Sequence, residues 1–221
     1  LMIHISTDEI YGDRRSKDPA HEETLPMPSN PYSASKAGAD FLAQAYARTY
    51  QLPITIIRGC NNFGPYQYPE KLMPMIITNL MEEKTIPLHG DGAHIRSWIY
   101  VKDFCRAIDT IWHKSKPGEI FNVGGEQKTN KHIVDTIHER MGIAHRNHIR
   151  TVADRPGQDT HYALNWEKLK RTLGWAHAYL FEDALKGKIR WYQTNPSWWK
   201  NIKETDGFKN HWDMQSRGQW W

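Results

Sequence analysis

The order of the first three predicted elements constrains the fold more than any other feature of this sequence. Residues 2–5 form an apolar run that passes into polar residues, as a buried parallel strand does at its carboxyl end. After Asn30-Pro31, a typical helix start, a helix is predicted over residues 32–50. Residues 53–58 then form a second strand, rich in β-branched side chains. Strand, helix and strand in this order predict an α/β fold with a parallel sheet.

The rest of the chain continues as a mixture of helices and strands. Further helices are predicted at residues 70–84, 102–113, 130–141, 166–173 and 182–193, and strands at residues 86–89, 97–101 and 119–123. In the helix at residues 32–50, we expect the apolar face to consist of Phe41, Leu42, Ala45, Tyr46 and Thr49. Residues 204–221 contain tryptophans but no periodicity, and we predict that they form a tail outside the fold.

Composition is typical of a globular protein and excludes several classes of function. Of 221 residues, 39% are hydrophobic and 24% are charged, and no apolar run is long enough to span a membrane. A net charge of +4 without a clustered patch does not support nucleic-acid binding. Two cysteines cannot form a disulfide framework, and with no recognisable signal peptide they indicate a cytoplasmic protein. The twelve histidines show no metal-ligand spacing, so we expect no metal site.

Tyr32 and Lys36 lie four residues apart, so both side chains project from one face of the predicted helix. A nearby ammonium favours the tyrosinate, which lowers the pKa of the phenol and makes it a usable general base. The alternative is a chance pair, because the chain contains ten tyrosines and many lysines.

Thr7, Asp8 and Glu9 directly follow the first predicted strand. Ligands of open α/β sheets bind at the carboxyl ends of strands, where the turning backbone brings both carboxylates to one crevice. Two acids in one site have their pKa values pushed apart, so that one donates a proton while the other accepts one. The alternative is an ordinary polar strand end in which Asp8 caps a turn.

Asn61 and Asn62 follow the second strand, and their amides are suited to hold a sugar hydroxyl or a carboxamide. The alternative is a plain turn, because Asn, Gly and Pro are turn formers. Cations that could meet a diphosphate, or else lie solvated on the surface, are Arg58, Lys71, Arg96 and Arg155.

Seven short motifs in a fixed order carry a resemblance to a known family. They are Ser6–Gly12 (STDEIYG), Pro31–Lys36 (PYSASK), Asn61–Tyr66 (NNFGPY), Pro69–Leu72 (PEKL), Gly90–Gly92 (GDG), Asn122–Gly125 (NVGG) and Asp154–Gly157 (DRPG). With them the chain resembles, from residue 1 to about residue 202, the nucleotide-diphosphate-glucose 4,6-dehydratases, the dTDP-glucose enzymes most closely. These belong to the extended short-chain dehydrogenase/reductase superfamily. The Thr-Asp-Glu triplet separates them from related epimerases and decarboxylases.

The resemblance implies a reaction that uses the two clusters together. Tyr32 would act as the base while the sugar C4 hydroxyl is oxidised with NAD⁺, and Lys36 would hold the phenolate and the nicotinamide ribose. Glu9 would then remove the C5 proton while Asp8 protonates the departing C6 hydroxyl. Return of hydride to C6 would give a 4-keto-6-deoxy sugar. Thr7 would bond the sugar near C4.

The resemblance also implies binding residues for the cofactor and for a nucleotide-diphosphate sugar. Tyr32, Lys36 and Asn62 would contact the NAD cofactor, and Thr7 and Asn61 the sugar. The residues around the nucleotide and diphosphate would be Lys71, Leu72, Pro87, His89, Arg96, Asn130, Asp154 and Arg155. As in the family, we expect a homodimer.

The implied fold is the C-terminal part of a Rossmann-like doubly wound parallel sheet plus a smaller α/β substrate-binding region. Residues 1–66 would be a partial NAD-binding domain with the catalytic residues, and residues 67–203 mainly the nucleotide-sugar-binding region. No GxGxxG loop is present, so we expect NAD to bind poorly or not at all.

Three alternatives stay open at this point. Two are a UDP-glucose 4,6-dehydratase and a UDP-sugar epimerase, because His89 stands where the dTDP-type enzymes usually carry Tyr. The third is a nucleotide-sugar binder without catalysis.

Overall fold

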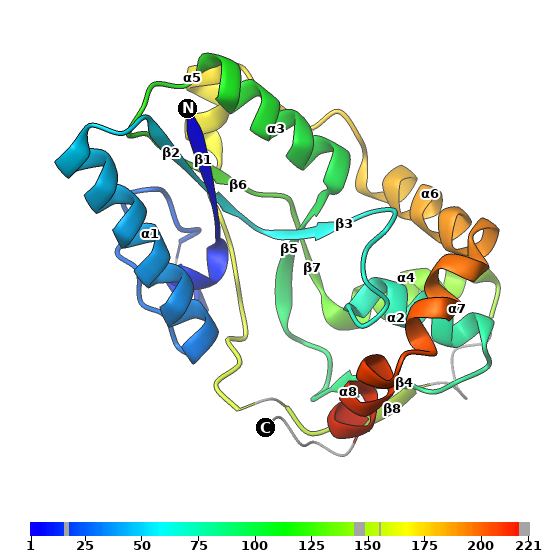
Figure 1. The fold of residues 1–221 in the computed structure, drawn as a ribbon. Helices are drawn as coiled ribbons and strands as arrows, with labels where there is room; N and C mark the ends of the chain where they lie inside the picture. The colour runs from blue at the N-terminus through cyan, green and yellow to red at the C-terminus, as the bar shows by residue number, and fades with distance from the viewer. Residues whose placement is uncertain (16–17, 144–148, 155, 217–221) are drawn as a thin grey trace. The chain divides into compact units, whose positions relative to one another are not determined.

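The computed structural model describes residues 1–15, 18–143, 149–154 and 156–216 (Figure 1). The chain divides into two compact units, each made of three separate segments. Unit 1 consists of Leu1–Asn62, Ile95–Gln127 and Gly157–Leu180, and unit 2 of Phe63–His94, Lys128–Pro156 and Phe181–Trp221. The segments of the two units alternate along the chain, whereas we predicted two contiguous domains, residues 1–66 and 67–203. The functions predicted for those two domains stay a prediction.

Unit 1 is built around a parallel sheet. Its strands β1 (Met2–Thr7), β2 (Ile54–Gly59) and β6 (Ile120–Val123) lie in the order β1-β2-β6. The helices α1 (Pro31–Tyr50), α3 (Val101–Lys114) and α5 (Glu167–Leu173) pack around it. In Figure 1, α1 lies on one side of the sheet, and α3 and α5 lie on the other. The predicted α/β class with a parallel sheet is confirmed.

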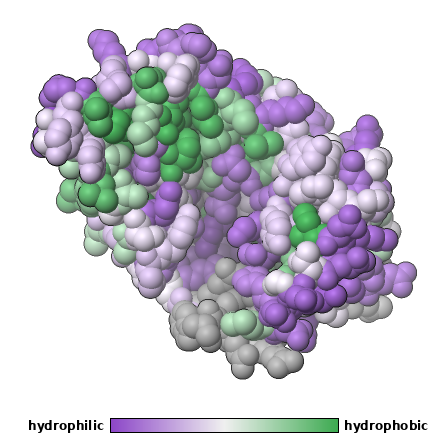
Figure 2. All heavy atoms as spheres, in the orientation of Figure 1, coloured by the Kyte–Doolittle hydropathy of each residue, from purple (hydrophilic) through white to green (hydrophobic). Residues whose placement is uncertain are grey.

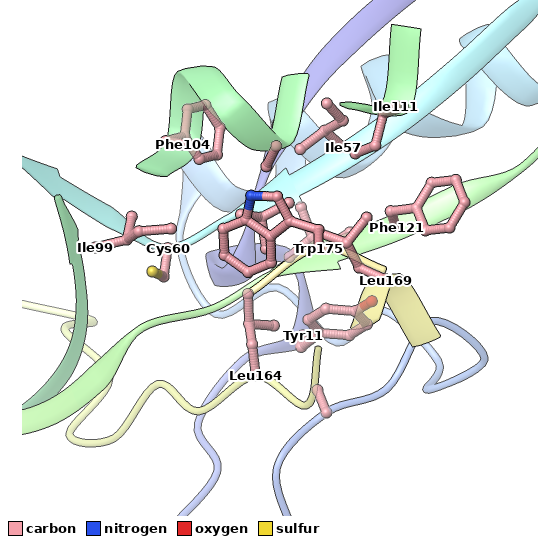
Figure 3. Close-up of a cluster of buried hydrophobic side chains, with 14 of the residues drawn as sticks. Tyr11, Ile57, Cys60, Ile99, Phe104, Ile111, Phe121, Leu164, Leu169 and Trp175 are labelled. Carbon is pink, nitrogen blue, oxygen red and sulfur yellow. The ribbon is translucent and has the colours of Figure 1, made fainter. Parts of the chain in front are cut away.

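Strand β2 is buried along its whole length because helices cover both of its faces. Ile56 packs with Ala43 of α1. Ile57, the next residue, points to the opposite face and joins a larger cluster with Phe104 of α3 and Leu169 of α5 (Figure 3). An uninterrupted apolar strand is what a parallel sheet with two covered faces requires.

Helix α1 turns short side chains to the sheet rather than the large apolar ones we expected. Its buried residues include Ala37, Asp40 and Ala43, whereas Phe41 and Leu42 are 54% and 61% exposed. Small side chains let the helix approach the strands closely, so the predicted apolar face lies on the surface. Figure 2 shows hydrophobic side chains gathered over β1 and the neighbouring part of α1.

Arg58, a candidate anion-binding cation, is instead part of a buried ion pair in unit 1. Its Nε lies 2.9 Å from Asp40 Oδ2, with 3% and 1% of the two side chains exposed. The guanidinium also donates to the Tyr11 hydroxyl (2.7 Å) and to the Glu22 carbonyl (2.9 Å). Because all these partners lie inside the fold, Arg58 holds α1 to β2 and is not available to a diphosphate.

Unit 2 contains a two-stranded parallel sheet and five helices among its described residues. Strands β4 (Ile86–His89) and β8 (Ile149–Val152) pair from Ile86↔Ile149 to His89↔Val152. The helices are α2 (Leu72–Met81), α4 (Asn130–Met141), α6 (Phe181–Thr194), α7 (Pro196–Lys203) and α8 (Asp206–Ser216). Helix α2 packs against β4, α4 and α6.

Three short elements complete the fold. A 3₁₀ helix, η1, covers Asp8–Tyr11. Strands β3 (Asn61–Phe63), β5 (Ile95–Tyr100) and β7 (Glu126–Thr129) form a three-stranded sheet in the order β3-β5-β7. Within the described ranges no helix is both long and apolar enough to cross a membrane.

Helix α8 corrects the prediction that residues 204–221 form a tail. Phe208 is buried, and its ring stacks on that of Trp212, 6.5 Å away between centroids. Two apolar residues at i and i+4 anchor one helical turn but are too few to reveal a helix period in the sequence. The correction extends to Ser216, and residues 217–221 lie outside the described residues.

Candidate active site

Strand β1 ends in a turn that separates the two neighbouring carboxylates. The Thr7 Oγ1 atom accepts a hydrogen bond from the Glu9 N–H (3.3 Å) and caps η1. Gly12 closes the turn with φ 68°, and a Cβ there would collide with the Met27 carbonyl oxygen, so only glycine fits. The turn buries Asp8 and leaves Glu9 half-buried.

Asp8 is a buried carboxyl group with one unpaired oxygen. Its Oδ1 accepts from the Thr7 hydroxyl (3.3 Å), while Oδ2 has no hydrogen-bond partner among the described residues. Burial, and then the charge of Glu9, raise the pKa of Asp8 to about 7, although Thr7 and Arg96 oppose the rise. Asp8 can therefore carry a proton near neutral pH, as a general acid must.

Glu9 accepts hydrogen bonds where α1 begins. Its Oε2 lies 3.3 Å from the Ser33 hydroxyl and 3.3 Å from the Tyr162 hydroxyl. Asn30 caps α1, because its Oδ1 accepts a hydrogen bond from the Ser33 N–H (2.9 Å). The helix cap thus fixes Ser33, the residue next to Tyr32. Ser33 in turn orients the Glu9 carboxylate.

Tyr32 and Lys36 both reach the carboxyl-end region of β1, but they do not form the simple pair we expected. Tyr32 is 55% exposed, and its phenol is close enough to Thr7 for that residue to affect its pKa. Lys36 Nζ donates to the Ile5 carbonyl (2.8 Å). Partial burial, and then the charges of Glu9 and Asp8, raise the pKa of Tyr32. The predicted lowering of the Tyr32 pKa by Lys36 is therefore wrong, because burial and the two carboxylates raise this pKa.

The remaining candidates of unit 1 lie in neighbouring strands. Asn61 and Asn62 begin β3, and Asn62 Nδ2 donates to the Cys60 carbonyl (3.1 Å). Arg96 in β5 is buried, and it donates to the carbonyls of Ile95 and Asp159, each at 2.8 Å. Its charge acts on Asp8 from within the fold.

In unit 2, two candidates stand where α2 begins. Lys71 is the residue before the first turn of α2, and Leu72 is its first residue. The Lys71 side chain is 60% exposed, and its Nζ lies 3.1 Å from Glu70 Oε1. The ammonium is therefore accessible to a ligand.

Four further candidates of unit 2 gather around His94 and the ends of β4 and β8. Pro87 and His89 belong to β4, and His89 Nδ1 lies 3.0 Å from the Ala153 carbonyl oxygen. Asp154 Oδ2 lies 3.8 Å from His94 Nε2, and the Asn130 N–H donates to the His94 carbonyl (3.0 Å). The Asn130 Oδ1 atom is buried with no partner among the described residues. Arg155 lies outside the described residues.

A family model matches most of the chain. It is described as GDP-mannose 4,6 dehydratase and matches residues 1–187. The chain belongs to this family. The resemblance drawn from the seven motifs to the 4,6-dehydratases is thereby confirmed.

Individual 4,6-dehydratases match at substantial identity. The dTDP-glucose 4,6-dehydratase of Shigella flexneri is 44% identical over 217 residues, covering 90% of this chain and 60% of that protein. The solved dTDP-glucose 4,6-dehydratase from Bacillus anthracis in complex with NAD has a TM-score of 0.87 and 46% identity, covering 91% of this chain and 64% of that one. The corresponding structure from Streptomyces venezuelae, with NAD and TYD bound, has a TM-score of 0.88, 42% identity and coverages of 91% and 62%.

This 4,6 dehydratase family member spans about 60% of the length of the curated relatives that it matches. Within its described residues, no group of three or more His, Cys, Asp or Glu side chains is arranged to hold a metal ion.

Sequence reasoning missed a polar network that supports Glu9 in this 4,6 dehydratase family member. The Tyr162 hydroxyl donates to Asp159 Oδ2 (2.9 Å), which also accepts from the Ser29 hydroxyl (2.6 Å). The Arg96 guanidinium lies 4.4 Å from the centre of the Tyr162 ring. Burial, and then the charges of Glu9 and Asp159, raise the pKa of Tyr162. The sequence feature nearest to this network is the Asp154–Gly157 motif, which ends two residues before Asp159 and does not include Asp159 or Tyr162.

The raised pKa of Asp8 predicts that this protein loses stability as the pH rises from about 4 to about 7. In this range the folded state keeps a proton that the unfolded state, with the ordinary pKa of 3.8, has released. The Asp8→Asn variant removes this linkage, so its free energy of unfolding should fall less over the same range. Urea unfolding at a series of pH values measures the two slopes. Asp109→Asn, at an exposed position of α3, should keep the parent slope, and equal slopes for all three proteins would contradict the prediction.

Proposed function

We propose that this chain carries the catalytic and nucleotide-sugar-binding residues of a dTDP-glucose 4,6-dehydratase. The carrying observation is the separation of the two carboxylates after β1. Asp8 is buried with a pKa raised to about 7, while Glu9 is half-buried and orients its Oε2 through Ser33 and Tyr162. Removal of water across two adjacent carbons needs an acid that donates a proton and a base that accepts one. Asp8 and Glu9 fit these two roles. The similar curated proteins are named dTDP-glucose 4,6-dehydratases, which supports dTDP-glucose as the proposed substrate.

The proposed reaction begins at C4 of the glucose. The Tyr32 phenolate takes the proton of the C4 hydroxyl, and Thr7 holds the oxygen through its hydroxyl. Glu9 then removes the proton at C5, and Asp8 gives its proton to the departing C6 hydroxyl, so that water leaves.

The residues around Tyr32 fit a nicotinamide cofactor. The exposed phenol and the Lys36 ammonium both stand at the carboxyl end of a parallel strand, and Asn62 follows the neighbouring strand. We therefore propose that Tyr32, Lys36 and Asn62 hold NAD⁺. NAD⁺ held there would supply the acceptor for the C4 hydride and the donor of hydride to C6. Glu9 would return its proton to C5, which gives the 4-keto-6-deoxy sugar.

The proposed nucleotide residues belong to unit 2. Lys71 offers an exposed ammonium to a diphosphate, and Asn130 offers a buried carbonyl oxygen without a partner among the described residues. Pro87, His89 and Asp154 stand at the ends of β4 and β8, where the His89 ring can stack on a pyrimidine. Leu72 and Arg155 complete the proposed set in unit 2. From unit 1, Arg96 is proposed for the diphosphate and Asn61 for the sugar.

The test is turnover of dTDP-glucose with added NAD⁺, followed by the alkali-developed absorbance of the 4-keto-6-deoxy product. UDP-glucose runs in parallel. In a protein restored to the length of its curated relatives, we expect dTDP-glucose to be converted and UDP-glucose to be converted more slowly. This chain, which has no GxGxxG loop, should bind dTDP with little or no turnover. Binding of dTDP without turnover by the restored protein would refute catalysis and favour a nucleotide-sugar binder, and preference for UDP-glucose would refute the proposed base.

We also propose a homodimer formed through α1. Phe41 and Leu42 are each more than half exposed, and an apolar patch of this kind marks a contact surface. Replacing both by lysine should convert the dimer to a monomer in size-exclusion chromatography with light scattering. Leu180→Lys changes a leucine that is 72% exposed elsewhere in unit 1, and it should leave the mass unchanged. A monomeric parent protein would contradict the proposal.

A further inference from the structure

We propose that the C-terminal helices α6, α7 and α8 act as a clasp that fixes the loop at residues 66–71 and thereby positions Lys71 and Leu72. The ligand assigned to these two residues rests on the proposed function. The clasp itself rests on contacts within unit 2, where four of the six loop residues touch the C-terminal helices.

Tyr66 begins the loop in a conformation that needs support. Its φ of 60° lies in the left-handed region, which costs energy for a side chain of this size. The ring lies 4.6 Å from that of Trp191 in α6 and 5.7 Å from that of Trp198 in α7. Two aromatic contacts therefore hold Tyr66 in a backbone conformation that it would otherwise rarely adopt.

Gln67 is held by both its side chain and its backbone. The Lys188 ammonium donates to Gln67 Oε1, and the Tyr192 hydroxyl donates to the Gln67 carbonyl oxygen. Both donors lie on α6 and are 0% exposed. The Trp199 indole N–H in turn donates to the Tyr192 carbonyl (2.9 Å), which ties α7 to the same point.

The burial of Lys188 indicates that its hydrogen bond to Gln67 is structurally important. An ammonium without a carboxylate is costly inside a protein, and within the described part of the chain no acid pairs with Lys188. Burial holds the pKa of Lys188 well below its usual range. A methionine of similar length would cost less, so the amine is present for the hydrogen bond to Gln67.

The rest of the loop is held by α8. The Tyr68 ring lies 6.1 Å from that of Phe208, and Glu70 Oε1 lies 3.5 Å from His211 Nε2. The Lys71 N–H then donates to the Tyr68 carbonyl (3.0 Å), so the fixed loop leads directly into the residue that begins α2. The position of the Lys71 backbone thus depends on residues more than a hundred positions later in the chain.

The contacts of the clasp with the loop lie outside the part of the chain that the family model matches. That match ends at residue 187, whereas every residue that contacts the loop from α6, α7 and α8 lies between positions 188 and 211. Six of the ten tryptophans follow position 190. The four of these that the structure describes contact the loop or a residue that holds it, so they serve loop positioning: Trp191, Trp198, Trp199 and Trp212.

Hydrogen exchange of the full chain, followed by mass spectrometry, tests the clasp without any ligand. Tyr192→Phe and Lys188→Met each remove one hydrogen bond to Gln67 and should speed exchange of residues 64–71 by about tenfold. Lys188→Met removes a buried amine that has no acidic partner among the described residues, so its unfolding midpoint should not fall. Tyr11→Phe removes a comparable buried hydroxyl in unit 1 and should leave the loop unchanged. Unchanged loop exchange, or faster exchange spread evenly over unit 2, would overturn the proposal.

Calorimetry with dTDP measures the consequence for the ligand. If the parent protein binds dTDP, both loop variants should bind it about tenfold more weakly while Tyr11→Phe matches the parent. Equal affinity in all four proteins would overturn the positioning of Lys71 and Leu72. A parent protein with no affinity for dTDP would refute the proposed function, and the exchange rates would still decide whether the clasp exists.

Discussion

Replacing Asp40 by alanine is expected to lower the free energy of unfolding by about 3–5 kcal/mol, because it leaves the Arg58 guanidinium buried without its counter-charge. Two hydrogen bonds of 2.9 and 3.1 Å join the groups, and neither side chain is more than 3% exposed. The remaining partners of Arg58, the Tyr11 hydroxyl and the Glu22 carbonyl, are neutral. They cannot replace a carboxylate in an environment that excludes water.

Two further variants separate the buried charge from the lost contact. The double variant Asp40→Ala with Arg58→Met should recover most of the stability, because no unpaired charge remains. Asp135→Ala breaks the exposed pair of Lys131 and Asp135 and should cost less than about 1 kcal/mol. Urea unfolding measures all four proteins. Equal losses for Asp40→Ala and Asp135→Ala would show that the buried pair has no special role.

The second large effect concerns the proposed chemistry. In a protein restored to the length of its curated relatives, Glu9→Gln should slow water loss by about 10²–10⁴-fold while sparing oxidation at C4. The amide cannot take the C5 proton, but it keeps the shape beside Ser33 and Tyr162. Asp8→Asn should slow the same step, because no proton is available for the departing hydroxyl.

Two optical signals distinguish the steps. Reduced nicotinamide should accumulate in both variants, while the alkali-developed product signal should fall. In the parent, water loss should slow as the pH rises above about 7, since Asp8 then releases the proton that it must donate. Asp109→Asn serves as the neutral control. An equal loss of oxidation and water elimination would contradict the separate roles of Asp8 and Glu9.

The sequence contained enough to predict the elements around the sheet. The run at residues 53–58 is apolar throughout because both faces of β2 are covered, and Asn30 caps α1 as its position suggested. The orientation of α1 was not predictable from its large residues. A helix packed closely on a sheet turns alanines inward, and apolar periodicity alone does not distinguish a buried face from a contact surface.

The candidate site was predictable in its residue types but not in its electrostatics. The motif around residues 7–9 locates two acids, whereas the turn that buries only Asp8 depends on Gly12 and on Met27, which no local pattern links. The raised pKa of Tyr32 follows from its partial burial and then from the charge of Glu9, on a different element. Long-range partners such as Asp159 and Tyr162 become visible only when the chain is folded.

The interleaving of the two units also has a consequence for synthesis on the ribosome. All segments of unit 1 have been made once residue 180 is added, whereas the last segment of unit 2 begins only at residue 181. Gln67 therefore waits for Lys188 and Tyr192, which follow it by 121 and 125 residues. Closing such long stretches of chain is slow, so the nascent chain carries a complete set of unit 1 segments while unit 2 is still unfinished. Helices α6, α7 and α8 are translated after every segment of unit 1, and they complete the folding of unit 2.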